Sequence, residues 1–123
     1  MSRILIVDDD QRIVQLLSDC FKQAHTVDIA MNGGEALAII RRQRPDVVLL
    51  DLMLPGISGV HLLKEIKEID PTIAVVVITG RGNNAVADEA IRNGAASYLS
   101  KPFNLADIDR LVTDIIARHR PTG

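Results

Sequence analysis

Acidic residues follow two apolar runs in this sequence, and their types and positions suit them to chemistry. The triplet Asp8-Asp9-Asp10 follows the run 4–7, and Asp51 follows the run 47–50. Four aliphatic residues in a row predict a strand buried on both faces. If the two strands are neighbours in a parallel sheet, these acids converge at its carboxyl edge, where sheets of this class bind ligands.

The predicted acidic cluster has an electrostatic cost. Two carboxylates ~4 Å apart at an effective dielectric near 20 repel each other by ~4 kcal/mol. The cluster therefore needs a bound cation or a proton. Taken alone, Asp51 could equally be a strand-ending residue that caps the next turn. The acidic triplet after the first strand favours a functional site instead.

The bulk properties of the chain set the broad class. Its 123 residues fit one domain, which we place at 1–119, with 120–123 as a tail or the start of a linker. A net charge of −2 gives no basic field for direct nucleic-acid binding. The single cysteine, Cys20, can form no internal disulfide. No signal peptide or membrane-spanning stretch is evident, so we expect a cytoplasmic protein without a membrane partner.

The elements that must position the acids alternate regularly along the chain. Apolar runs predict strands at 3–7, 26–30, 47–51, 73–78 and 97–100. Helical periodicity predicts helices after Asp10, after the break at 32–34, after Ser58, at 83–93 and from about Asn104. Five strands alternating with five helices predict an α/β fold, a (βα)5 doubly wound parallel sheet covered on both faces.

Individual helices carry more specific expectations. Asp10 and Ser58 are predicted N-caps, and Gly94 is a predicted C-terminal cap of the fourth helix. The fourth helix has a thin, alanine-rich apolar face, so we expect it to be the least firmly packed. The buried face of the first helix is predicted from its spacing to comprise Ile13, Leu16, Leu17, Cys20 and Phe21.

Two further strand ends complete a pattern. Thr79 follows the fourth strand, and Lys101-Pro102 follows the fifth. With the acidic pair after the first strand and Asp51 after the third, the chain resembles the receiver domain of two-component response regulators. The resemblance spans residues 4–116 and implies a flavodoxin-like, CheY-like sheet with strand order 2-1-3-4-5. It also implies a cis peptide bond between Lys101 and Pro102.

The resemblance implies roles for the acidic residues. Asp51 would accept a phosphoryl group from a phosphohistidine, giving an aspartyl phosphate. Asp9, Asp51 and the backbone carbonyl of Met53 would ligate Mg²⁺ directly, and Asp8 would act through a bound water. Mg²⁺ prefers oxygen ligands and keeps several waters, which suits a shallow acidic pocket.

The remaining implied roles concern the phosphoryl group and the switch. Lys101 would pair with one phosphoryl oxygen and Thr79 would hydrogen-bond another. The Tyr98 ring would move inward and change the surface of the fourth helix, fifth strand and fifth helix. Such a chain is a signalling domain that assists its own phosphorylation and dephosphorylation, and not an enzyme acting on a separate substrate.

The implied partners are proteins. The phosphoryl donor would be a sensor histidine kinase or a histidine phosphotransfer protein, and the signal would pass to an output domain or partner protein. The resemblance also allows a phosphorylation-dependent homodimer.

Two alternative functions remain open. One is a docking module that works without phosphorylation, against which the complete set of acids, Thr79 and Lys101 argues. The other is an aspartate-nucleophile phosphatase of the haloacid dehalogenase type. That signature needs a second Asp two residues after the nucleophile, where this chain has Met53.

Overall fold

A five-stranded parallel sheet forms the centre of the computed structural model, which describes residues 2–54, 58–80 and 84–119. The strands are β1 (Arg3–Val7), β2 (Thr26–Ala30), β3 (Val47–Asp51), β4 (Ala74–Thr79) and β5 (Ser97–Ser100). The helices are α1 (Gln11–Phe21), α2 (Gly33–Arg42), α3 (Gly59–Ile69), α4 (Asn84–Arg92) and α5 (Leu105–His119). The strand order is β2-β1-β3-β4-β5, which confirms the predicted α/β class and topology. The predicted tail at 120–123 lies outside the described residues.

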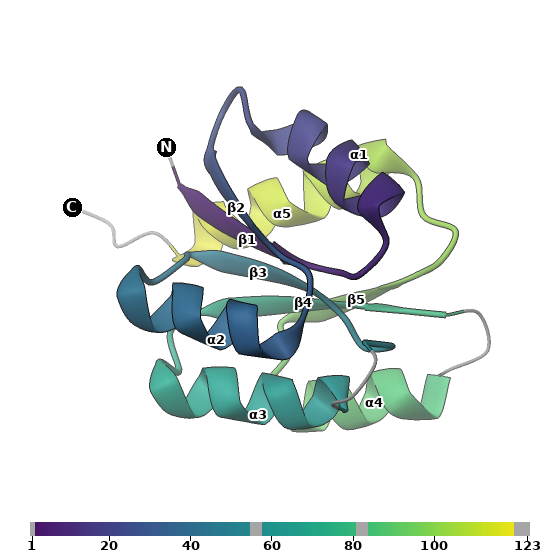
Figure 1. The fold of residues 1–123 in the computed structure, drawn as a ribbon. Coiled ribbons are helices and arrows are strands. Elements are labelled where there is room, and N and C mark those ends of the chain that lie inside the picture. The colour runs from purple at the N-terminus through teal and green to yellow at the C-terminus, as the bar shows by residue number, and fades with distance from the viewer. Residues whose placement is uncertain (1, 55–57, 81–83, 120–123) are drawn as a thin grey trace.

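Two helical layers enclose the sheet. Helices α1 and α5 cover one face, and α2, α3 and α4 cover the other (Figure 1). Successive side chains of a strand point to opposite faces, so each central strand supplies both cores. In β1, Leu5 and Val7 belong to the α2–α4 side, while Ile4 and Ile6 belong to the α1–α5 side. This two-sided burial explains why the central strands are apolar throughout.

The register of the sheet brings the chemically interesting strand ends together. Val7 pairs with Leu50, so Asp8, the next residue, lies beside the end of β3. Asp51 pairs with Ile78 at the end of β4. Thr79 pairs with Ser100, which places Lys101 immediately beyond the same edge.

The predicted helix ends are confirmed where the structure describes them. The Asp10 side chain accepts the Arg12 backbone N–H at 2.9 Å and caps α1. The Ser58 hydroxyl caps α3 through the His61 N–H at 3.5 Å. Gly94, after α4, adopts φ +105°, a conformation that glycine takes without strain.

The structure differs from the predictions at Leu16 and at the ends of β4. Leu16 was predicted to be buried, but its side chain is 44% exposed, because α1 turns Val14, Leu17 and Phe21 toward the sheet and leaves Leu16 at the rim. Strand β4 runs one residue later than predicted, so that Thr79 is its last residue.

The expectation that α4 packs least firmly agrees with its burial. Among its residues only Ala87 and Ala90 are buried, whereas α3 buries five. Within the described parts of the chain, no helix has the length and apolar character needed to cross a membrane.

Candidate functional site

Three carboxylates meet at the carboxyl edge of the sheet. Asp8 and Asp9 follow β1, Asp51 ends β3, and one carboxylate oxygen from each lies within 4.8 Å of the others. Asp8 is fully buried and Asp51 is 3% exposed, whereas Asp9 is exposed. The structure thus shows the convergence that the two apolar runs predict.

The Asp51 carboxylate is held from two directions. Its Oδ1 accepts the backbone N–H of Met53 at 2.9 Å, which closes a short turn after β3. Its Oδ2 faces the Lys101 ammonium at 3.3 Å. These two contacts fix the orientation of the carboxylate while one side of it stays next to the other acids.

The Asp8 carboxylate resembles that of Asp51 in its contacts, but only one of its two oxygens is hydrogen-bonded. Its Oδ1 accepts the backbone N–H of Asp10 at 2.9 Å. Its Oδ2 is buried without a hydrogen-bond partner, and the Lys101 Nζ lies 3.6 Å away, an ion-pair distance too long for a good hydrogen bond. Burial, with a smaller contribution from the nearby Asp51 carboxylate, raises the pKa of Asp8 to about 6, against the opposing effects of the Asp10 N–H and Lys101.

Lys101 is the cation that the described part of the site supplies. Partial burial works to lower the pKa of its ammonium, but the carboxylates of Asp51 and Asp8 outweigh burial and raise that pKa above its ordinary value. Lys101 therefore stays charged. One ammonium against three carboxylates leaves the cluster with an excess of negative charge.

The donor set of this cluster fits a divalent cation. It consists of carboxylate oxygens, the ligands that Mg²⁺ prefers, and the unpartnered Oδ2 of Asp8 is a buried acceptor. Two positive charges would balance the excess that Lys101 leaves. Met53 lies beside the cluster with its side chain 61% exposed, and the ligand role of its carbonyl stays a prediction.

The two residues predicted to form the switch lie in neighbouring strands, with Thr79 at the end of β4 and Tyr98 within β5. Thr79 is 2% exposed, and its carbonyl accepts the Lys101 backbone N–H at 2.8 Å, which ties β4 to the end of β5. The Lys101–Pro102 peptide bond is cis, as the resemblance implies. Tyr98, in β5, has 41% of its surface exposed, so its ring lies outward in this structure.

Sequence reasoning missed an apolar groove next to Lys101. It measures about 360 Å³ and is lined by Ile13, Leu16, Lys101, Pro102 and Phe103. The signal in the sequence was Phe103, a large apolar residue directly after the Lys-Pro pair. The exposed Leu16 belongs to this groove, which explains why an apolar residue occupies the rim of α1.

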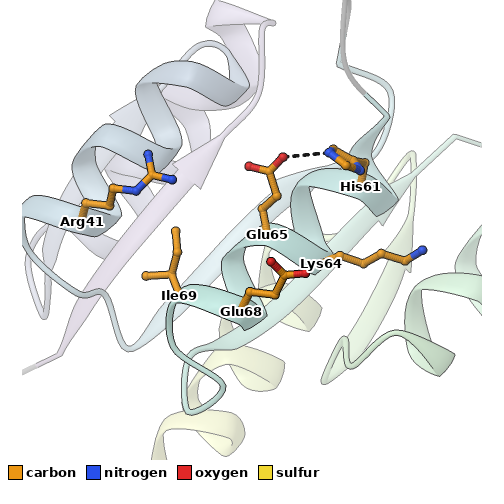
Figure 2. Close-up of a pocket in the computed structure, with 6 residues that line it drawn as sticks. All are labelled: Arg41, His61, Lys64, Glu65, Glu68 and Ile69. Carbon is orange, nitrogen blue, oxygen red and sulfur yellow. Dashed lines mark ion pairs between the residues drawn. The ribbon is translucent and has the colours of Figure 1, made fainter.

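A second hollow lies between α2 and α3, separate from the acidic cluster. It measures about 410 Å³ and is lined by Arg41, His61, Lys64, Glu65, Glu68 and Ile69 (Figure 2). Figure 2 shows the His61 ring directed at the Glu65 carboxylate one helical turn away, at 2.7 Å. Its lining mixes both signs of charge, so it lacks the excess of carboxylates found at the sheet edge.

Comparisons with known proteins agree with this geometry. The family model for the response regulator receiver domain matches residues 4–113. Sporulation initiation phosphotransferase F of Bacillus subtilis is 39% identical over 97% of this chain and 94% of its own length. Regulatory protein AtoC of Escherichia coli is 36% identical over 91% of this chain, which spans only 24% of that protein. The crystal structure of the receiver domain of NtrX from Brucella abortus superposes with a TM-score of 0.88 at 35% identity, covering 93% of this chain and 98% of that one.

Proposed function

The chain belongs to the response regulator receiver domain family, the phosphoacceptor modules of two-component signal transduction systems, and we propose that Asp51 is its phosphoacceptor. The observation that carries the proposal is the Asp51 carboxylate itself. It is nearly buried, oriented by the Met53 N–H and Lys101, and adjacent to two further acids. Asp8 has similar surroundings, but its Oδ2 lies 3.6 Å from Lys101 and has no hydrogen-bond partner. Among the described carboxylates, only Asp51 is hydrogen-bonded both to a backbone N–H and to Lys101.

The proposed reaction transfers a phosphoryl group between two nucleophiles. A carboxylate oxygen of Asp51 forms a bond to phosphorus while the bond from phosphorus to the donor breaks, and the donor keeps that electron pair. With a phosphohistidine donor, the leaving imidazole then takes up a proton. Each transfer leaves one aspartyl phosphate and one free histidine.

The residues around Asp51 have separate tasks in this proposal. A Mg²⁺ ion held by Asp8, Asp9, Asp51 and the Met53 carbonyl would neutralise negative charge on the phosphoryl group and on the attacking carboxylate. Lys101, already 3.3 Å from Asp51, would move its ammonium to a phosphoryl oxygen. The same groups would assist dephosphorylation, in which a water oxygen bonds to phosphorus, the bond from phosphorus to the Asp51 oxygen breaks, and inorganic phosphate and the free carboxylate result.

The partner part of the proposal names a sensor histidine kinase or a histidine phosphotransfer protein as donor. The apolar groove along Ile13, Leu16 and Phe103 supports a protein donor. Lys101 also lines this groove, and its ammonium lies 3.3 Å from Asp51, so the groove is close to the proposed phosphoacceptor. An apolar helix of the donor resting there would bring its phosphohistidine to the site. The cytoplasm is the proposed location, which fits a chain whose single cysteine can form no internal disulfide.

The output part of the proposal concerns the side of the domain that carries Tyr98. Thr79 would be drawn to the phosphoryl group, Tyr98 would turn inward, and α4, β5 and α5 would present a changed surface to an output domain or partner protein. A second phosphorylated copy is the other candidate for this surface. The thin packing of α4 supports this assignment.

The test is phosphorylation with two donors, followed by measurement of intact mass. With Mg²⁺ and acetyl phosphate, the parent and Asp10→Asn should gain the mass of one phosphoryl group, because the Asp10 carboxylate is engaged with Arg12. Asp51→Asn should gain nothing, and a persistent gain in that variant would refute the assignment. With a phosphohistidine protein as donor, Leu16→Asp should slow transfer while its reaction with acetyl phosphate stays at the parent rate. Equal rates for Leu16→Asp and the parent with the protein donor would refute the docking groove.

A further inference from the structure

The first residue of α3 lies unusually close to the loop that carries the site. A Cβ added to Gly59 would lie 2.4 Å from the Cα of Leu52, 2.7 Å from its carbonyl oxygen and 2.8 Å from its Cδ2. Ordinary van der Waals contact begins at about 3.4 Å, so no side chain fits here without a shift of backbone. Gly59 is therefore required by this close approach and not by an unusual backbone angle.

Leu52 connects the two residues whose placement matters most at this edge. It follows Asp51 and precedes Met53, whose N–H holds Asp51 Oδ1 at 2.9 Å. Its own N–H donates to the Ile78 carbonyl at 3.0 Å, and its side chain is 6% exposed. The Leu52 backbone thus sets the direction of the two peptide groups that flank it, and the second of these carries the Met53 N–H that holds Asp51.

We propose that Gly59 is a positioning residue for the phosphoacceptor site, because the bare α-carbon lets the first turn of α3 press on Leu52 and so fix Met53 against Asp51. This inference rests on the proposed function. It adds a residue that touches neither Asp51 nor the phosphoryl group, and acts on them through the loop.

The loop, and not the helix, is the part that yields when a Cβ is added. Helix α3 is anchored by Leu62, Leu63 and Ile66, each with no exposed surface. In the loop, Leu52 and Leu54 are each 6% exposed and Met53 between them is 61% exposed, so fewer fully buried side chains hold the loop than hold α3. The retreat needed is about 1 Å, from 2.4 Å to 3.4 Å, and a misplacement of that size in a reacting site costs about 100-fold in rate.

The experiment compares Gly59→Ala with Gly34→Ala, a matched control. A Cβ at Gly34 would meet only Asn32 Oδ1, at an ordinary 3.4 Å. In metal-free protein, the Met53 amide resonance should move in Gly59→Ala and stay in place in Gly34→Ala. In Gly59→Ala, the Mg²⁺ concentration at half-saturation should rise by about 10- to 100-fold, as when groups that orient metal ligands are lost. Phosphorylation by acetyl phosphate should slow by about 100-fold.

The outcomes separate this inference from the function on which it rests. A folded Gly59→Ala protein with the parent's Met53 resonance and Mg²⁺ midpoint would overturn the positioning role while Asp51 remains the phosphoacceptor. A parent that takes no phosphoryl group would overturn the proposed function, and the metal-free Met53 resonance would still decide about Gly59. Adding Leu52→Ala to Gly59→Ala should restore nothing, because the two shortest contacts are to backbone atoms.

If Gly59→Ala does not fold, a second pair of variants replaces it. Leu54→Ala removes a buried anchor of the same loop, and Leu63→Ala removes one from α3. Each variant loosens one side of the contact between α3 and Leu52, so both should move the Met53 resonance and raise the Mg²⁺ midpoint. Ile91→Ala, at a position of α4 that is 41% exposed, is the control and should do neither. Parent values in both Leu54→Ala and Leu63→Ala would overturn the inference.

Discussion

Two helices begin just beyond the site, and the domain holds them very differently. Helix α3 follows the Asp51 strand and buries five of its residues, with Gly59 pressed on the preceding loop. Helix α4 follows the Thr79 strand and buries only Ala87 and Ala90. Phosphoryl transfer needs carboxylates that stay in place, whereas a switch needs an element that moves at low cost. The difference supports the proposal that the chemistry occurs on the α3 side and the response on the α4 side.

The largest expected effect tests this difference in packing directly. Leu63, in α3, has no exposed surface, and Leu63→Ala should lower the free energy of unfolding by about 2–5 kcal/mol. Ile91, in α4, is 41% exposed, and Ile91→Ala should lower it by less than about 1 kcal/mol. Urea unfolding of both variants measures the two losses. Equal losses would mean that α4 is packed as firmly as α3, and would contradict the proposed difference between the two helices.

An intermediate effect concerns the buried Asp8 carboxyl, which lies next to Asp51 at the carboxyl edge of the sheet. The pKa of Asp8 is about 6 in the folded state against an ordinary 3.8, so between these values the folded state holds more protons than the unfolded one. The free energy of unfolding should therefore fall as the pH rises from about 4 to about 6, and stay low above that range.

Removing the Asp8 charge should recover this stability. In Mg²⁺-free buffer at about pH 7.5, Asp8→Asn should raise the free energy of unfolding by about 1–3 kcal/mol, with little gain at about pH 4. Urea unfolding at both pH values measures the effect. Asp10→Asn is the control and should show no gain, because the hydrogen bonds from Arg12 hold the pKa of Asp10 below its ordinary value. A stability of Asp8→Asn that equals the parent at pH 7.5 would contradict the burial argument.

The fold that positions the site residues could be predicted from the sequence. Continuous apolar runs identify buried strands, and the alternation with helices leaves few topologies to consider. The acids, Thr79 and Lys101 could be placed at one edge because parallel strands share a carboxyl end. The register of the sheet confirms that these strand ends are neighbours, because Val7 pairs with Leu50 and Thr79 pairs with Ser100.

Contacts between distant backbones could not be predicted in the same way. Periodicity placed Leu16 on the buried face of α1, but a few degrees of helix rotation decide which residue lies at the rim. Gly59 was visible in the sequence. The reason for a glycine there, that a Cβ would collide with the Leu52 backbone, depends on how α3 packs after the turn. The turn hydrogen bonds from Asp10 to Asp8 and from Met53 to Asp51 likewise depend on side-chain orientation.

The smallest energetic effect concerns Thr79, the proposed link between Asp51 on the α3 side and helix α4. A phosphoryl group on Asp51 would draw Thr79, and the space so vacated would admit the Tyr98 ring, now 41% exposed. Such a switch needs only a few kcal/mol of differential interaction, which charge-assisted hydrogen bonds to a phosphate can supply. Because Ala87 and Ala90 are the only buried residues of α4, with Val86 partly buried against the same core, its displacement would cost little.

Thr79→Ala should therefore accept a phosphoryl group and fail to transmit it. The measurement is an amide chemical-shift map with and without beryllofluoride, a phosphoryl mimic, for the parent, Thr79→Ala and the exposed control Thr113→Ala. In the parent and Thr113→Ala, large shifts should extend over residues 84–103. In Thr79→Ala they should stay near Asp51, because the hydroxyl that pulls β4 toward the phosphoryl group is gone. Shifts of equal extent in all three proteins would show that the α3 side moves α4 by a route that does not include Thr79.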